Sequence, residues 1–201
     1  NSAFLINDFS ENQLYHKSKL VVGVENFPYQ DILKPVLGDV MIDLGGTVAM
    51  KTTQPDREVF TLKDSVSTAP IICYESIYGE YVTGYVKNGA QFLSIITNDA
   101  WWGNTAGHRQ HASYAKLRAI ETRRSVARSA NTGISEIIDP TGKVTHKLGY
   151  EKQGTLSGKI ILNDEITFYA LHGDYIARIS KFLALFIFLF AIVGFKRSKY
   201  F

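Results

Sequence analysis

The feature that most constrains this chain is a long apolar run close to its C-terminus. Residues 182–195 carry no polar side chain, and extension back to Ile176 gives the length that a bilayer-spanning helix needs, about 20 residues. The run is apolar on every face and rich in Phe and Leu, a composition that favours lipid on all sides. The alternative is a buried helix of a soluble core or of a dimer interface. We expect a transmembrane helix at 176–195.

Charges on either side of this run predict its orientation. Lys196, Arg197 and Lys199 follow it, which by the positive-inside rule predicts a cytoplasmic C-terminus and a preceding domain outside the cytoplasm. Arg178 and Lys181 weakly favour the opposite orientation. The predicted organisation is therefore a domain at 1–175, a membrane helix at 176–195 and a short basic cytoplasmic tail at 196–201.

The rest of the chain has the composition of one folded domain. Its 201 residues are 45% hydrophobic and 20% charged, and a net charge of +3 is too small to indicate a nucleic-acid partner. The single cysteine excludes an internal disulfide and a Cys-rich zinc site. The chain begins "NSAFLIND" without an initiator Met, and no basic region precedes an apolar stretch, so no signal peptide is visible. We expect a fragment of a larger protein.

Strand and helix patterns alternate through the domain. Strands are predicted at 2–7, 15–24, 68–73, 91–99 and 154–162, helices at 74–90 and 107–131, and a hairpin at 133–148 that turns at 139–142. A strand–helix–strand–helix centre flanked by hairpins is typical of a layered α/β fold.

The only cysteine, Cys73, stands where a buried strand ends and a helix begins. Ligands of layered α/β proteins collect at the carboxyl ends of strands, and a helix N-terminus favours a thiolate. Glu75 follows closely, and Asn98, Asp99, Trp101 and Trp102 gather where the next predicted strand ends. A lone cysteine in an apolar run is more often a packing residue, so position alone leaves both interpretations open.

Two lysines alternate within the second predicted strand. Lys17 and Lys19 are two residues apart, so both are expected on one side of it. This side is either a solvated face or one that aims an ammonium into a pocket, where it would stabilise an oxyanion.

Other charged residues fit simpler interpretations. Glu121, Arg123, Arg124 and Arg128 fall on the predicted helix at 107–131 and indicate salt bridges on a solvated face. His108 and His111 have metal-compatible spacing, but no thiol lies nearby in sequence, so we expect no metal site. A backbone role is expected for Gly133, in the turn after this helix.

Four motif blocks together resemble the apolipoprotein N-acyltransferases, a family with a nitrilase-like (carbon-nitrogen hydrolase) domain. They are "YHKSKLVVGVENFPY", "IICYESIYGEYV", "TNDAWWGNTAGHRQHASYAKLRAIETRRSVARSANTGIS" and "TFYALHGDYIAR". The resemblance extends from about Asn1 to Arg178. It implies a partial nitrilase-like α-β-β-α sandwich followed by one C-terminal transmembrane helix. The common "LVPFGE" run reads "LVVGVE" here, with Val22 in place of the proline.

The resemblance also assigns roles to residues. It implies that Cys73 is the nucleophile, Lys17 the triad lysine and Glu25 a second functional glutamate, with Tyr74 and Glu75 supporting the nucleophile. The general-base glutamate of the triad would lie before the first strand and is expected to be absent from this chain. Trp101, Trp102 and Asn98 are candidate substrate-binding residues, although the two indoles fit the protein core equally well.

The implied reaction is acyl transfer without metal or cofactor. A phospholipid would donate an acyl chain to Cys73 as a thioester, and the N-terminal amine of a diacylglyceryl apolipoprotein would accept it. This implies a bacterial inner-membrane enzyme with its catalytic domain on the periplasmic side. The alternatives are a nitrilase-type amidase and an inactive fragment that lacks its general base.

Overall fold

The computed structural model describes residues 1–6, 11–21, 25 and 53–198, with side chains up to residue 192. Its strands are β1 (Ser2–Leu5), β2 (Gln13–His16), β3 (Phe60–Thr61), β4 (Ser67–Ile72), β5 (Phe92–Thr97), β6 (Val126–Ala130), β7 (Ser135–Ile138) and β8 (Val144–Leu148). Its α-helices are α3 (Gly79–Lys87), α4 (Ala106–Thr122), α5 (Phe168–His172) and α6 (Tyr175–Ser198). Short 3₁₀ helices occur at Lys63–Ser65 (η1), Cys73–Ile77 (η2) and Ala100–Trp102 (η3).

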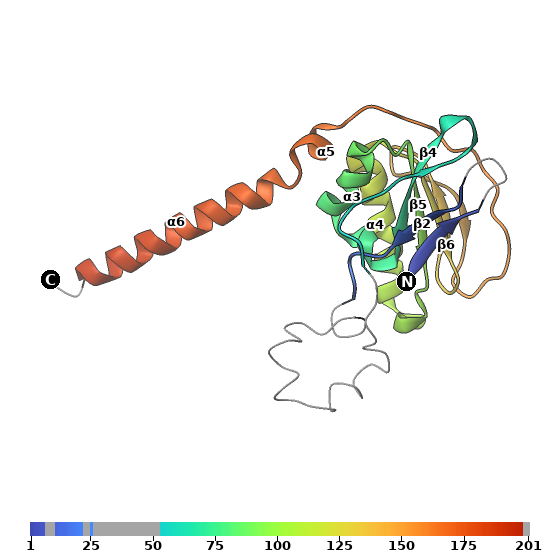
Figure 1. Cartoon of the computed structure of the whole chain (residues 1–201). Coiled ribbons are helices and arrows are strands. Elements are labelled where there is room, and N and C mark those ends of the chain that lie inside the picture. Colours follow the sequence, from blue (N-terminus) through green and yellow to red (C-terminus); the bar gives the residue numbers. More distant parts are fainter. Residues whose placement is uncertain (7–10, 22–24, 26–52, 199–201) are drawn as a thin grey trace, which may run out of the picture.

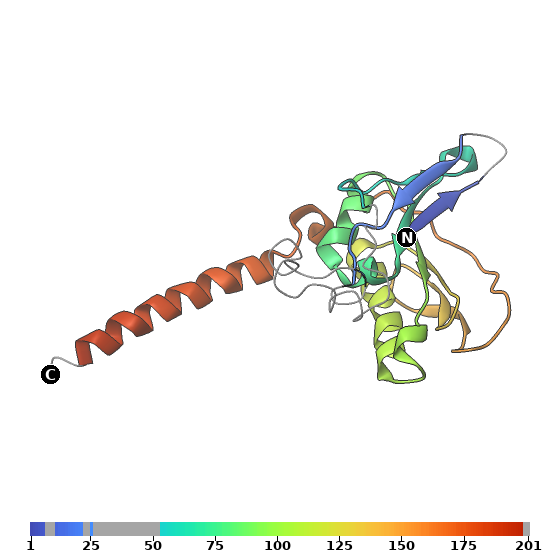
Figure 2. The same cartoon turned by 60° about the horizontal axis from the view of Figure 1, so that its bottom comes forward.

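A six-stranded sheet in the order β3-β4-β5-β6-β7-β8 forms the centre of the domain. Strands β4, β5 and β6 are parallel, and the outer pairs are antiparallel. Helices α3 and α4 are the crossovers between the parallel strands, and Figures 1 and 2 show them on the same face of the sheet. The predicted layered α/β class is therefore confirmed.

The core lies between this sheet and the two helices. Leu93 and Ile95 lie two residues apart on one face of β5 and are buried. Ala115 and Ala119 of α4 are fully buried in the same core cluster. Small alanine side chains on this stripe let the helix approach the strands closely. The predicted strands at 68–73 and 91–99 are confirmed as β4 and β5.

The first two strands form a separate antiparallel ribbon beside β3 and β4. Ser2 pairs with His16 and Leu5 with Gln13, and the Gln13 side chain exchanges two hydrogen bonds with the Thr61 backbone of β3. The predicted strand pair is therefore confirmed, but β2 ends at His16 rather than at residue 24. Residues 22–24 of the predicted strand lie outside the described residues.

The long helix predicted at 107–131 is wrong in its second half. Helix α4 ends at Thr122 because Arg123 adopts a left-handed backbone with φ of 53°, and residues 126–130 form β6. The predicted solvated face is also wrong for two arginines of this segment, since Arg124 is 1% exposed and Arg128 is 3% exposed. Arg124 donates to the carbonyls of Ala90 and Thr122. It is therefore a buried link between α4 and the residues before β5.

The strand predicted at 154–162 does not form. Its apolar residues Ile161 and Leu162 are 56% and 44% exposed. The Ile161 N–H donates to the Ser125 hydroxyl, and the Asn163 N–H donates to the Gln91 carbonyl. This part of the chain therefore crosses the sheet where β5 and β6 begin and does not pair with either strand. Apolar composition alone did not distinguish these two arrangements.

The hairpin predicted at 133–148 is confirmed as β7 and β8. The Gly142 N–H donates to the Asp139 carbonyl at 2.9 Å, and Gly142 has φ of 85°. The Asp139 carboxylate accepts from the backbone N–H groups of Thr141 and Lys143. Glycine closes the turn because it adopts this positive φ without strain.

Helix α6 extends away from the domain (Figures 1 and 2). By length and composition its Tyr175–Ile192 segment is able to cross a membrane, and none of it is buried against the rest of the described protein. The foot of the helix is held by an ion pair between Arg178 and Glu80 of α3. The alternative that this segment is a buried helix of a soluble core does not agree with the structure, because the segment is exposed.

Candidate active site

Cys73 begins a sharp turn from strand to helix. It follows the last residue of β4 and opens η2, and its φ of 50° lies in the left-handed region. A non-glycine residue in this region is uncommon and persists only where its surroundings hold it. The side chain is half-buried and forms no disulfide. We call residues 72–76 the Cys73 turn.

A cavity of about 420 Å³ opens at the carboxyl ends of the parallel strands. Strands β4, β5 and β6 run in the same direction, so the residues that follow them meet at one edge of the sheet. The cavity is lined by Asn1, Lys17, Glu25, Ile72, Cys73, Ile96, Thr97, Asn98, Trp101 and Asn131. Five of the predicted site residues are therefore brought together here from distant parts of the chain: Cys73, Lys17, Glu25, Asn98 and Trp101.

Lys17 enters the cavity as one half of a buried ion pair. Its Nζ lies 2.7 Å from Glu25 Oε2, and its side chain is 2% exposed. The same carboxylate oxygen accepts from the Val21 N–H at 2.8 Å, and the Asn1 side chain donates to the other oxygen. Glu25 thus fixes where the ammonium lies in the cavity that Cys73 also lines.

The structure corrects the expectation that Lys17 and Lys19 share one side of a strand. Both follow β2 rather than belonging to it, so strand alternation does not apply to them. Lys17 is buried, whereas Lys19 is exposed and its ammonium lies 5.3 Å from the centre of the Tyr81 ring. Only Lys17 lines the cavity.

Glu75 is fully buried and joins the lysine segment to the Cys73 turn. Its Oε1 accepts from the Ser18 N–H at 2.7 Å and from the Tyr15 hydroxyl at 2.7 Å. Its Oε2 accepts from the Ile72 N–H at 2.8 Å. Burial, with the Glu75 negative charge next, raises the pKa of Tyr15 and of Tyr85 above the usual range, so both hydroxyls remain donors.

The remaining predicted residues lie around the cavity or beside it. The Trp101 ring lines the cavity and is 75% exposed, whereas Trp102 packs 5.0 Å from the His111 ring. The two tryptophans therefore differ, and only Trp101 is placed to meet a ligand. Tyr74 packs edge-on against Tyr78 and is not among the lining residues.

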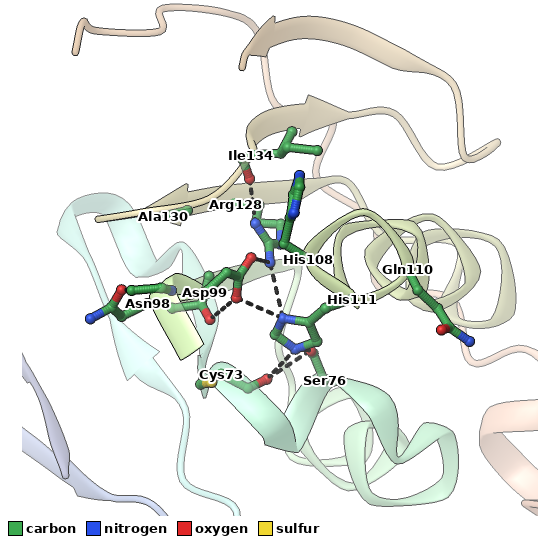
Figure 3. Close-up of polar contacts among 12 residues, drawn as sticks. Cys73, Ser76, Asn98, Asp99, His108, Gln110, His111, Arg128, Ala130 and Ile134 are labelled. Carbon is green, nitrogen blue, oxygen red and sulfur yellow. Dashed lines mark hydrogen bonds and ion pairs between the residues drawn. The ribbon is translucent and has the colours of Figure 1, made fainter. Parts of the chain in front are cut away.

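A buried polar cluster beneath the Cys73 turn was missed by the sequence analysis (Figure 3). Asp99 Oδ2 lies 2.7 Å from Arg128 Nη2, and its Oδ1 lies 2.9 Å from His111 Nδ1. The expected backbone role of Gly133 is confirmed here, because a Cβ at this position would come within 2.6 Å of Asp99 Oδ2. The sequence analysis placed Arg128 on the solvated face of a helix and therefore did not connect it with Asp99. An acidic residue where a buried strand ends could still have indicated a buried ion pair.

The electrostatics of this cluster favour an ionised Asp99. Burial acts to raise the pKa of Asp99, but the hydrogen bond from His111 and the charge of Arg128 together outweigh it and lower that pKa. His108, three residues before His111, instead faces the Gly103 carbonyl and stacks on Tyr150. The two histidines therefore have separate partners.

Comparisons with known families agree with this architecture. The carbon-nitrogen hydrolase family model matches residues 1–168. An amidase from Nesterenkonia sp. AN1, with acrylamide added at its active-site cysteine, superposes with a TM-score of 0.56 at 16% sequence identity. The match covers 89% of this chain and 62% of the amidase chain. At this identity the likeness shows a shared nitrilase-like α/β fold.

Curated relatives are more similar in sequence. The apolipoprotein N-acyltransferase of Chlorobaculum tepidum is 37% identical over 170 residues, which are 83% of this chain and 32% of the relative. The apolipoprotein N-acyltransferase of Bradyrhizobium diazoefficiens is 34% identical over 186 residues, which are 92% of this chain and 34% of the relative. The chain thus spans about a third of the length of the relatives it matches.

Replacement of Glu75 by Gln should destabilise the domain strongly. Both carboxylate oxygens accept from backbone N–H groups, so either orientation of the amide points an NH₂ group at a donor. We expect Glu75→Gln to lower the free energy of unfolding by about 3 kcal/mol, measured by urea denaturation in detergent. Glu80→Gln is the matched control, because its ion pair with Arg178 is about half-exposed and such pairs contribute at most about 1 kcal/mol. Equal losses in both variants would contradict the role given to Glu75.

The Asp99 cluster should make stability depend on pH in the acid range. The pKa of Asp99 is lower in the folded chain than in the unfolded chain, so its contribution is complete above about pH 4 and declines as the pH falls further. We expect the difference in unfolding free energy between the native protein and Asp99→Asn to be constant from about pH 7 to pH 5 and to shrink below about pH 4. A difference that stayed constant down to about pH 3 would contradict this assignment.

Proposed function

This chain belongs to the carbon-nitrogen hydrolase family, and from that membership we propose that it carries the acyl-transfer chemistry of an apolipoprotein N-acyltransferase. Cys73 is the nucleophile, and Lys17 stabilises the charge that develops on the substrate. The acyl donor is a phospholipid, and the acceptor is the N-terminal amine of a diacylglyceryl apolipoprotein. The reaction forms and consumes a thioester on Cys73.

One arrangement carries this proposal, namely the Lys17–Glu25 ion pair in the same cavity as Cys73. A thiol, an ammonium and a carboxylate line one cavity of about 420 Å³ although they come from different segments. A cationic donor fixed beside a nucleophile suits the stabilisation of a tetrahedral oxyanion, since it needs little rearrangement during the reaction. The relatives at 37% and 34% identity direct the proposal to acyl transfer.

The first step transfers the acyl group to the protein. The thiolate of Cys73 attacks the ester carbonyl carbon, a C–S bond forms, and the carbonyl electron pair moves onto oxygen. Lys17 donates a hydrogen bond to this oxyanion. As the intermediate collapses, the C–O bond to the glycerol breaks, and the lysophospholipid leaves as an alcohol after it takes up a proton from the glutamate implied by the family, which then acts as the base of the second step. The acyl chain remains on Cys73 as a thioester.

The second step releases the acyl chain to the acceptor. The α-amine of the lipid-modified cysteine attacks the thioester carbonyl, a C–N bond forms, and the C–S bond breaks to restore the thiolate. The amine loses one proton, which the glutamate base implied by the family would accept. Neither step needs a metal or a cofactor.

The surroundings of the cavity suit a lipid substrate. Trp101 and Ile96 present exposed apolar surface at the cavity, and Asn98 adds an amide. We assign Trp101 and Asn98 to substrate binding, whereas Trp102 packs against His111 and does not line the cavity. Glu75 and Tyr74 act indirectly, because Glu75 ties the Lys17 segment to the Cys73 turn and Tyr74 packs that turn against Tyr78.

The proposed location is the bacterial inner membrane. Helix α6 has 24 residues, and at about 1.5 Å per residue this exceeds the hydrocarbon thickness of about 30 Å. We propose a catalytic domain at 1–175 on the periplasmic side, a membrane helix at 176–195 and a cytoplasmic tail at 196–201. A domain tethered in this way meets both of its lipid substrates at the bilayer surface.

The acyl-enzyme provides the direct test of the reaction. The full-length protein, which supplies the glutamate base implied by the family, is purified in detergent and incubated with a phospholipid of defined acyl chains, and intact-mass and peptide mass spectrometry then locate the acyl group. We expect one acyl adduct on Cys73 that neutral hydroxylamine removes, and no adduct in Cys73→Ala. Lys17→Met should slow adduct formation by about 100-fold, because the oxyanion loses its charged donor.

Lys19→Met is the matched control for this experiment. It removes the same charge two residues away, from a side chain that does not line the cavity, so its rate should equal that of the native protein. Adduct formation at the native rate in Cys73→Ala, or its absence with every phospholipid offered, would contradict the proposal. Ammonia released from short amides without any acyl adduct would identify an amidase instead.

The orientation of the chain is tested separately by labelling in cells. Single cysteines are introduced into a Cys73→Ser background, as Ser157→Cys in the exposed loop of the domain and Ser198→Cys at the end of α6. A membrane-impermeant maleimide should label Ser157→Cys in spheroplasts and should label Ser198→Cys only after lysis. The reverse pattern would place the domain in the cytoplasm.

A further inference from the structure

The buried cluster beneath the Cys73 turn lies outside the cavity and takes no part in the steps above. It joins residues from four segments: Ser76 of η2, Asp99 after β5, His111 of α4 and Arg128 of β6 (Figure 3). All four are at most 3% exposed, and none lines the cavity. Its point of contact with the nucleophile is the Cys73 backbone carbonyl.

His111 holds this carbonyl directly. Its Nε2 lies 3.2 Å from the Cys73 oxygen and 3.2 Å from the Ser76 hydroxyl, which itself donates to the same Cys73 oxygen at 2.8 Å. Carbonyl and carboxylate oxygens only accept hydrogen bonds, so the contact with the Cys73 carbonyl needs a hydrogen on Nε2 and the contact with Asp99 needs one on Nδ1, as in an imidazole ring that carries both hydrogens. The Cys73 carbonyl therefore accepts from both His111 and Ser76.

The opposite side of the ring is fixed just as firmly. Nδ1 lies 2.9 Å from Asp99 Oδ1, and that carboxylate is held by Arg128 at 2.7 Å and by the Thr97 hydroxyl at 2.9 Å. The Trp102 ring packs 5.0 Å from the imidazole and limits its movement. The ring is thus anchored to β5 and β6 and has little freedom to turn away from Cys73.

The backbone of Cys73 needs such a support. Its φ of 50° lies in the left-handed region, which a residue with a side chain rarely occupies unless its surroundings impose it. The next peptide begins at the carbonyl that His111 holds, so the hydrogen bond restrains the turn directly at the nucleophile. Without it, the turn is free to relax and carry the thiol out of its position in the cavity.

We propose that His111 is a positioning residue, whose Nε2–H group holds the Cys73 carbonyl and so keeps the thiol directed at the cavity beside Lys17. The inference rests on the proposed function only in taking Cys73 as the nucleophile. Asp99 and Arg128 serve the same purpose one step further away, because they fix the imidazole. The cluster thus holds the Cys73 turn on the side that faces away from the cavity.

The test measures the reactivity of Cys73 without any acyl substrate. Because the chain has one cysteine, its rate of alkylation by iodoacetamide, followed by mass spectrometry on the full chain in detergent, reports Cys73 alone. We expect His111→Ala to slow alkylation by about tenfold, because the Cys73 thiol moves away from the Lys17 ammonium, which favours the reactive thiolate. His111→Gln should restore the rate to within about threefold of native, because its amide NH₂ still donates to the carbonyl.

His108 provides the matched control. It lies on the same helix, is equally buried at 2% exposure and makes a comparable contact with the Gly103 carbonyl, but it does not touch Cys73. His108→Ala and His108→Gln therefore remove a buried imidazole at similar cost and should leave the alkylation rate at the native value. Thermal unfolding of every variant identifies any that fail to fold.

Several results would overturn the proposal. They are a native alkylation rate in His111→Ala, a His111→Gln rate as low as that of His111→Ala in equally stable proteins, and an equal loss in the His108 variants. If neither His111 variant folds, nitrogen-15 NMR of the histidine rings in the native protein tests the proposal instead. A His111 Nε2 atom without hydrogen cannot donate to the Cys73 carbonyl and would contradict the proposed positioning role.

The outcome is independent of acyl transfer. If alkylation is slower in His111→Ala but the native protein forms no phospholipid adduct, the positioning role is retained and the acyltransferase is rejected. If the native protein forms the adduct but His111→Ala is alkylated at the native rate, the acyltransferase is retained and the positioning role is rejected.

Discussion

The carboxylate of Glu75 is the interaction on which the rest of the site depends. It is fully buried and accepts hydrogen bonds from the backbone N–H groups of Ser18 and Ile72 and from the Tyr15 hydroxyl. These donors belong to segments almost 60 residues apart in sequence, and a buried carboxylate is tolerated only when such donors surround it. Glu75 therefore fixes the segment of the lysine to the segment of the nucleophile.

Around this link, the Cys73 turn is held from two directions. Glu75 holds the N–H of Ile72 on the side of the Lys17 segment, and His111 holds the carbonyl of Cys73 on the side of β5 and β6. The left-handed backbone of Cys73 lies between these two contacts. A strained residue with supports on both sides is preorganised, so little rearrangement is needed when a substrate enters.

Errors of the sequence analysis occurred where tertiary contacts outweighed local pattern. The helix predicted to residue 131 ends at Thr122, because the left-handed Arg123 stops it and Val126 begins a strand that pairs with β5. The strand predicted at 154–162 does not form, because the Ile161 N–H bonds to the Ser125 side chain and the next residues bond elsewhere too, with the Asn163 N–H donating to the Gln91 carbonyl. Neither partner is visible from local propensity, since each lies far away along the chain.

The sequence alone determined the elements with strong local signals: the buried strands before Cys73 and Asn98, the hairpin closed at Gly142 and the apolar C-terminal helix. It also indicated Cys73, Lys17 and Glu25 as candidates, through their motifs. Only the tertiary structure decided that Lys17 is buried and Lys19 exposed, and that Arg128, Asp99 and His111 support Cys73 from behind. The physical reason is that periodicity records which face of an element is apolar, whereas a buried polar contact depends on which distant donor meets which acceptor after the strands have paired.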